Sequence, residues 1–189
     1  MAKAKEALRG LRGGRFWLIT SNTSTEYTTG AMVMLVGAQS LSRADTRQDI
    51  RIDADDDIYS QENDLQYTEY TLQLAELPLE IEATLGGHTY DETEQRITYN
   101  VLDQASEVAF AYASLKLDKN YRMFTHYCVK LTEISCDLAT KGESGDILPY
   151  TLTFRSQTRR ADGNWGKTQD STDGTYALLD TIDQIQETP

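Results

Sequence analysis

The sequence predicts a mainly β protein folded as a single domain. From residue 15 onward, apolar and polar residues alternate in short runs, turn sequences separate the runs, and helical periodicity is scarce. A chain of 189 residues fits one domain and can bury about 70% of its unfolded surface. Apolar residues make up 39% of it, which is typical of globular rather than disordered proteins. We therefore expect one hydrophobic core that needs no metal or disulfide.

Period-two alternation marks the individual strands. Residues 68–74, 97–101 and 150–154 alternate apolar with polar side chains, which predicts strands with one buried and one solvated face. Residues 107–117 are apolar on both faces, as expected of a central strand covered on both sides. The long run at 121–138 changes its apolar phase near Glu133, which predicts a β-bulge or a sharp bend there.

Helix signals are few. Residues 78–85 predict a short helix, with Pro78 in the first turn, Glu80 and Glu82 near its start, and Gly86 as its stop. Residues 176–186 have apolar side chains at helical spacing, but this segment is also compatible with an extended conformation. Turn sequences occupy residues 86–87, 118–120, 142–145 and 162–163.

Two charged segments resist assignment to the core. Residues 1–14 predict an arm rather than a strand. The formal net charge of residues 1–15 is +4. Because the net charge of the whole chain is −12, the rest of the chain carries −16. Residues 42–64 hold eight acids and three arginines and predict a long charged loop; as a hairpin, it could reach about 35 Å from the body. The opposite charges predict that arm and loop make contacts between subunits or successive rings. The candidate residues are Lys3, Lys5, Arg9, Arg12, Arg15, Asp53, Asp55, Asp56 and Asp57.

The acidic run that begins at Asp53 starts like an EF-hand loop, with acids at positions 1, 3 and 5. Position 6 is Ile58 instead of glycine, position 12 is Asp64 instead of glutamate, and no pair of helices flanks the run. We interpret it as a solvated or subunit-facing acidic segment and expect no metal site.

No other motif indicates chemistry. His88 and His126 neighbour no serine or cysteine motif, and the sequence has no phosphate-binding glycine loop. Cys128 and Cys136 would lie roughly 26 Å apart on one strand, too far to bridge, so both are expected to be reduced. We therefore expect no catalytic residue, cofactor or metal. The longest apolar run has six residues, and the start of the chain lacks a signal-peptide core, which favours a soluble protein that does not insert into membranes.

With these segments placed, their order resembles the phi13-type major tail proteins of siphophages. The resemblance spans roughly residues 30–165, and its weight lies in the joint order of β-strand patterns. The basic start, residues 1–15, departs from the family pattern. The similar stretches are residues 36–41, 52–59, 70–78 followed by 85–86, 108–113, 127–130, and 150–154 followed by 159–163.

The resemblance implies a tail-tube fold, a β-sandwich or partial barrel with a flanking helix. It also implies six copies per ring, rings stacked into the DNA-conducting tube of the virion tail, and assembly in the bacterial cytoplasm. Tape measure, tail terminator and distal tail proteins are the implied partners, and genomic DNA would pass through without specific binding. The acidic body predicts an acidic lumen wall that repels DNA, with Glu69, Gln73 and Glu94 as candidate lumen-facing residues.

Two other functions stay open at this stage. A β-sandwich binding module of a virion, such as a carbohydrate-binding or adhesin domain, would present an aromatic platform. Here eleven tyrosines are spread through the strands, and Trp17 and Trp165 lie at the two ends of the β region. An enzyme is the third alternative, although no residue pattern points to one.

Overall fold

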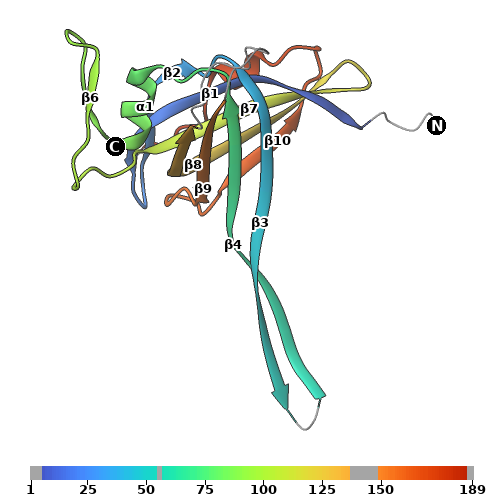
Figure 1. The fold of residues 1–189 in the computed structure, drawn as a ribbon. Coiled ribbons are helices and arrows are strands. Elements are labelled where there is room, and N and C mark those ends of the chain that lie inside the picture. The colour runs from blue at the N-terminus through green and yellow to red at the C-terminus, as the bar shows by residue number, and fades with distance from the viewer. Residues whose placement is uncertain (1–5, 55–56, 137–148, 187–189) are drawn as a thin grey trace, which may run out of the picture.

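The structure is a computed structural model that describes residues 6–54, 57–136 and 149–186. Its main feature is an antiparallel sheet in the order β2-β1-β7-β8-β9-β4-β3, with β10 also paired to β8; β5 and β6 form a separate two-stranded sheet (Figure 1). The strands are β1 Leu8–Asn22, β2 Tyr27–Met34, β3 Ala38–Ala54, β4 Asp57–Leu74, β5 Thr89–Asp91, β6 Arg96–Thr98, β7 Glu107–Lys116, β8 Tyr121–Cys136, β9 Tyr150–Gln157 and β10 Gly166–Asp170; the helices are α1 Leu79–Gly86 and the 3-10 turn η1 Ala177–Asp180. The prediction of a mainly β fold is confirmed.

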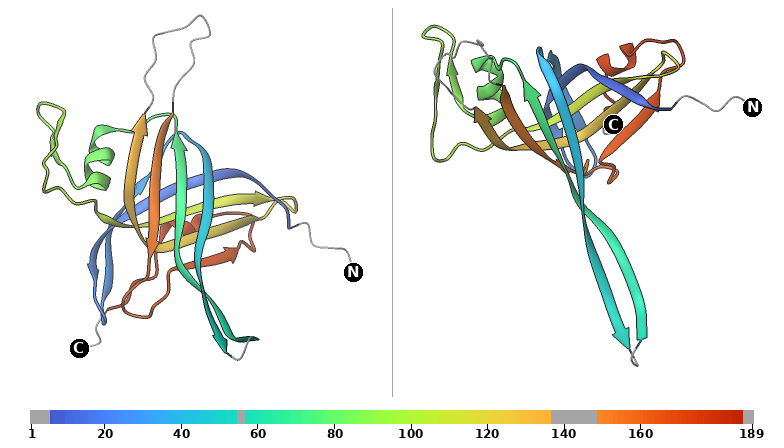
Figure 2. Two further views of the ribbon diagram at one scale, coloured as in Figure 1. Left: turned by 60° about the horizontal axis from the view of Figure 1, so that its bottom comes forward. Right: turned by 45° about the vertical axis from the view of Figure 1, so that its right-hand side comes forward.

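The sheet bends around a core because β8 changes its partner along its length. The first part of β8, residues 122–126, pairs with β10, and the second part, residues 128–136, pairs with β9. Strands β1 and β7 therefore face strands β4 and β9 across the core, as in a sandwich (Figure 2). Buried side chains from all four strands form this core, among them Phe16, Tyr70, Phe110 and Phe154.

The period-two expectations hold in the long strands. In β4, Tyr70, Leu72 and Leu74 are buried while the residues between them are half-buried. Six consecutive residues of β7 are buried, residues 108–113, as expected for a central strand. Strand β8 has an irregular register between Leu131 and Glu133, so the predicted bulge is confirmed at its predicted place.

The predicted internal helix is confirmed as α1. Pro78 stands at its N-cap, and the left-handed residue that ends it is Gly87, with φ 71°. Residues 176–186 form the short turn η1, which an extended stretch follows. Ile185 of this stretch forms an antiparallel bridge with Tyr27. This C-terminal segment lies against the outer side of β1, β7 and β8. It covers a second small cluster there that includes Trp17, Ala111 and Met123.

Three sequence predictions are wrong. Strand β1 begins at Leu8, so residues 8–14 are strand rather than arm. Gly10 and Gly13 have positive φ and lie at the register shifts of β1, where they interrupt the apolar–polar alternation that would indicate a strand. The stretch 42–64 is not a loop, because its described residues continue β3 and β4 into one hairpin. Strand β6 ends at Thr98, and Val101, expected inside a strand with a buried face, is 98% exposed. No helix within the described ranges is long and apolar enough to cross a membrane.

Candidate functional site

The hairpin of β3 and β4 projects away from the rest of the molecule (Figures 1 and 2). Strand β9 pairs with β4 only from Glu69 to Leu74. Beyond Glu69, the two hairpin strands pair only with each other among the described strands, from Asp45 opposite Thr68 to Ala54 opposite Asp57. Ten residues of extended strand span about 33 Å, in agreement with the reach expected for a hairpin.

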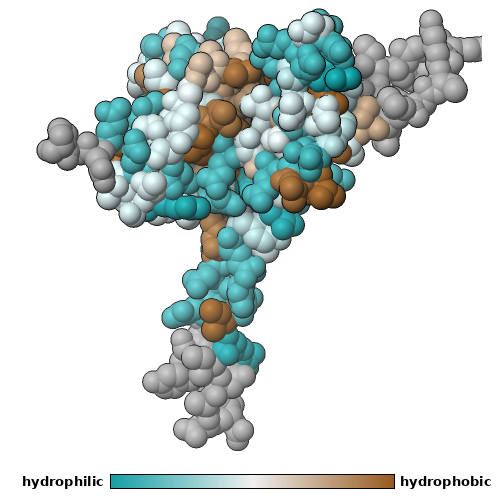
Figure 3. All heavy atoms as spheres, turned by 90° about the vertical axis from the view of Figure 1, so that its left-hand side faces the viewer, coloured by the Kyte–Doolittle hydropathy of each residue, from teal (hydrophilic) through white to brown (hydrophobic). Residues whose placement is uncertain are grey.

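Polar side chains dominate the hairpin surface, and Ile50, which is 42% exposed, is an apolar residue among them (Figure 3). Arg43 pairs with Asp45 at 2.9 Å, Arg47 donates to the Asn63 carbonyl at 3.4 Å, and Asn63 also donates to Asp49. An isolated two-stranded ribbon without an apolar face is marginally stable in water. Residues 45–68 carry eight acids and two arginines, so charge repulsion adds to this weakness. A second surface that covers or neutralises the hairpin would stabilise it.

A second feature is the outward side of β3, β4, β9 and the second half of β8, which we call the polar face. None of its side chains is buried, six carry hydroxyl groups, and its two acids are balanced by two bases. The polar face is therefore broad, hydroxyl-rich and close to neutral. Its residues are Ser40, Ser42, Ala44, Glu69, Thr71, Gln73, Lys130, Glu133, Ser135, Thr151, Thr153 and Arg155.

The structure brings two of the three candidate lumen-facing residues together on the polar face. Glu69 accepts from Arg155 at 3.2 Å, and Gln73 accepts from Ser40 at 2.7 Å. Glu94 lies elsewhere, in the turn between β5 and β6, where it pairs with Arg96 at 2.8 Å. The expectation of an acidic strand face is therefore wrong for these residues, because Arg155 and Lys130 offset the acids of the polar face.

The candidate arm residues have different environments. Lys3 and Lys5 lie outside the described residues, and Arg9 and Arg12 are exposed on β1. Arg15 is 3% exposed, forms an ion pair with Asp180 and stands over the Tyr176 ring. Arg15 thus holds the C-terminal segment against the sheet of its own subunit, which corrects its assignment to subunit contacts.

The start of the described chain is tied to the body by charges. Glu6 pairs with Arg122 at 2.6 Å and with Lys116 at 3.2 Å, and both cations also contact Asp170 at 2.6 and 2.8 Å. The two cations lower the pKa of the Asp170 carboxyl well below its usual range. This cluster fixes the direction in which residues 6 and 7 leave the sheet.

The acidic candidates sit where β3 turns into β4. Asp53 and Asp57 belong to these strands, and Asp55 and Asp56 lie outside the described residues. The flanking elements are strands, so the EF-hand pattern has no structural counterpart. No cluster of three or more His, Cys, Asp or Glu side chains that could hold a metal occurs in residues 6–54, 57–136 and 149–186. The free cysteines Cys128 and Cys136 are not bridged.

Sequence reasoning missed the most unusual titratable group, His126. It is 2% exposed and its Nδ1 lies 3.0 Å from the Tyr70 hydroxyl, while its ring stacks on Trp165 at 5.9 Å. Its Nε2 has no hydrogen-bond partner in the part of the chain that the structure describes. Burial, together with the charge of Arg43, lowers the pKa of His126 to about 3. The imidazole is therefore a neutral core residue.

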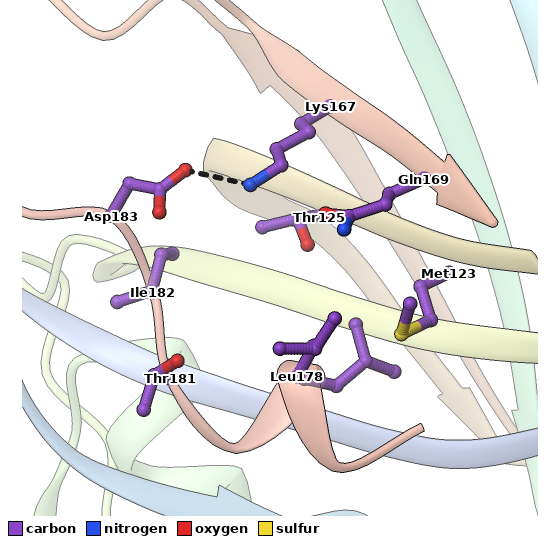
Figure 4. Close-up of a pocket in the computed structure, with 9 residues that line it drawn as sticks. Met123, Thr125, Lys167, Gln169, Leu178, Thr181, Ile182 and Asp183 are labelled. Carbon is purple, nitrogen blue, oxygen red and sulfur yellow. Dashed lines mark hydrogen bonds and ion pairs between the residues drawn. The ribbon is translucent and has the colours of Figure 1, made fainter. Parts of the chain in front are cut away.

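A small hollow of about 100 Å³ separates the C-terminal segment from the sheet (Figure 4). Lys167 points across it to Asp183, and their charged groups are 3.2 Å apart. Leu178 and Met123 line the opposite side. Because its one cation and one anion already satisfy each other, the hollow presents no unpaired charge to a ligand.

Comparisons with known proteins yield no assignment. No family model matches the chain, and no curated protein is significantly similar to it.

Proposed function

We propose that this protein is the major tail tube subunit of a long-tailed bacteriophage, six copies of which form a ring that stacks into a DNA-conducting tube. The projecting hairpin is the observation that carries the proposal. A ribbon about 33 Å long, which pairs with no other described strand of its own subunit, is long enough to lie across a neighbouring subunit or ring. A tube built of repeated copies supplies such a surface to every hairpin.

The polar face supports the same function. Facing the lumen, it would present hydroxyl groups and balanced charges to DNA, which carries one negative charge per ~1.7 Å of its axis. A basic lining would bind DNA through released counterions and slow its passage. A neutral, hydroxyl-rich lining has no net positive charge that would bind the DNA phosphates. We therefore attribute free passage of DNA to a neutral lining rather than to an acidic one.

The described structure offers less to a binding module. Trp17 is buried, and Trp165 is packed between His126 and the guanidinium of Arg43, so neither contributes to an exposed aromatic platform. The tail tube therefore remains our proposal.

Excision of the hairpin tests the proposal. Residues 47–66 are replaced by a two-residue Asn-Gly turn, which closes antiparallel strands with little strain. We expect the shortened protein to keep its β circular dichroism spectrum and its cooperative melting, because the core lies elsewhere. Wild-type protein should form rings and tubes with rising concentration in negative-stain images, and the shortened protein should form none. Normal tubes from the shortened protein would contradict the role assigned to the hairpin.

A further inference from the structure

An exposed apolar turn follows β6. Val101 is 98% exposed and Leu102 is 80% exposed, and the neighbouring Tyr99 is 63% exposed. We call residues 99–103 the apolar knob. It stands at the α1 edge of the molecule, which faces the viewer in Figure 3, where apolar side chains are surrounded by hydrophilic ones. Single exposed apolar residues are ordinary, but two adjacent ones that touch almost nothing contribute little to their own fold.

The knob is held in one conformation by its polar neighbours. The Asn100 amide donates to Asp103 Oδ2 at 2.7 Å, and the Leu102 amide donates to Asn100 Oδ1 at 2.9 Å. Asp103 Oδ2 also lies 2.8 Å from Nδ1 of His88. The Tyr99 ring packs edge-on against His88, with centroids 4.7 Å apart. Because these bonds fix the turn before any contact forms, little conformational entropy is lost when Val101 and Leu102 are buried by a partner.

A matching recess lies at the opposite edge of the sheet. A hollow of about 380 Å³ opens between the start of β1, the end of β7 and the edge strand β3. We call it the apolar groove; its apolar lining residues are Leu8, Leu11, Leu41, Tyr112 and Phe124. In Figure 2, α1 and β5–β6 lie on the β8 side of the sheet, whereas the start of β1 and strand β3 lie on the other side.

The two edges also differ in charge. Residues 76–103, which include α1 and the knob, carry seven acids and one arginine. The groove is lined by Arg43, whose charge is paired with Asp45, and by no acid. The exposed Arg9 and Arg12 lie on the strand that borders it. The acids around the apolar knob therefore complement the exposed Arg9 and Arg12 beside the apolar groove.

We propose that the apolar knob of one subunit inserts into the apolar groove of the next copy of this chain. A knob and a groove on opposite edges make a head-to-tail contact, and such contacts close into a ring when the rotation between copies permits it. With the polar face turned inward, the β3 edge of each subunit meets the α1 edge of its neighbour, so the contact lies within a ring. The inference rests on the proposed ring assembly and identifies the residues that form it.

The first test replaces the two apolar side chains of the knob. The double variant Val101→Ser with Leu102→Ser should fold as wild type does, since both side chains are exposed. Its critical concentration for ring formation should rise at least about tenfold, because two apolar side chains no longer become buried. The matched control is Leu178→Ser, which changes a residue that is 60% exposed on η1 and should assemble normally.

The second test identifies the groove as the occupied site. The variant Leu8→Asp with Gln39→Asp places two carboxylates at the groove and should also fail to form rings. An equimolar mixture of knob and groove variants retains one intact knob and one intact groove, so analytical ultracentrifugation should detect heterodimers that do not grow further. Absence of heterodimers, or normal rings from either variant, would overturn the inference while wild-type rings still support the tail-tube function. A wild-type chain that stays monomeric would overturn both.

Discussion

Protonation of His126 should destabilise the fold at acidic pH. Its pKa is about 3 in the folded protein and about 6.5 in the unfolded chain, so the unfolded state binds the extra proton between these values. The stabilisation by neutral His126 is complete above pH 6.5 and is lost progressively as the pH falls towards 3. At 1.36 kcal/mol per pH unit, the loss at pH 4 is about 3 kcal/mol.

The His126→Gln variant isolates this effect, because glutamine stays neutral and its amide can form a hydrogen bond with the Tyr70 hydroxyl. Urea unfolding at pH 7, 5.5 and 4, followed by tryptophan fluorescence at low protein concentration, measures the free energy of unfolding of both proteins. Carboxylates titrate in both, so the wild-type minus variant difference reports His126 alone. We expect this difference to fall by about 3 kcal/mol between pH 7 and pH 4. A difference that stays constant with pH would show that His126 does not gain a proton on unfolding in this range.

Three further predictions concern single positions. Gly87→Ala should lower the free energy of unfolding several times more than the matched control Gly163→Ala, which should lower it by about 1 kcal/mol. Both glycines have positive φ, but only at Gly87 would the added Cβ lie 1.9 Å from a backbone carbonyl oxygen. Arg159→Lys should destabilise by about 2 kcal/mol in thermal melts, because lysine keeps the charge but loses the paired bonds to a carboxylate and the stacking on two tyrosine rings. In phage that still build tails, Glu69→Lys should slow DNA release in a way that high salt reverses, whereas Glu94→Lys should leave it unchanged; equal effects would contradict the assignment of the polar face to the lumen.

Local patterns predicted the parts of the fold that local physics decides. The phase change near Glu133 marks a real bulge in β8, because an inserted residue moves the following side chains to the opposite face. Pro78 marks the start of α1, because its fixed φ suits the first turn of a helix. The two-sided apolar run of β7 identified the central strand, because only burial on both faces tolerates it.

Features that depend on distant partners were not predictable in this way. The strand character of residues 8–14 comes from pairing with β7, which the glycine-rich sequence does not show. The alternation of residues 97–101 suggested that Val101 is buried. The only described partner of β6 is β5, and their pairing covers three residues and ends at Thr98, so Val101 lies beyond the strand and is exposed. The ion pair of Glu69 with Arg155 joins residues 86 positions apart on neighbouring strands, which local alternation does not show. His126 became notable only through Tyr70, which lies 56 residues away in the sequence.

Cryo-electron microscopy of the concentrated, purified protein tests the central claim most directly. We expect hollow tubes of stacked six-membered rings, with the polar face of β3, β4, β9 and β8 lining the channel and each hairpin lying across a neighbouring copy. A protein that remains monomeric at high concentration across several salts and temperatures would contradict it. So would an ordered assembly whose polar face points outward and whose hairpin contacts no other copy.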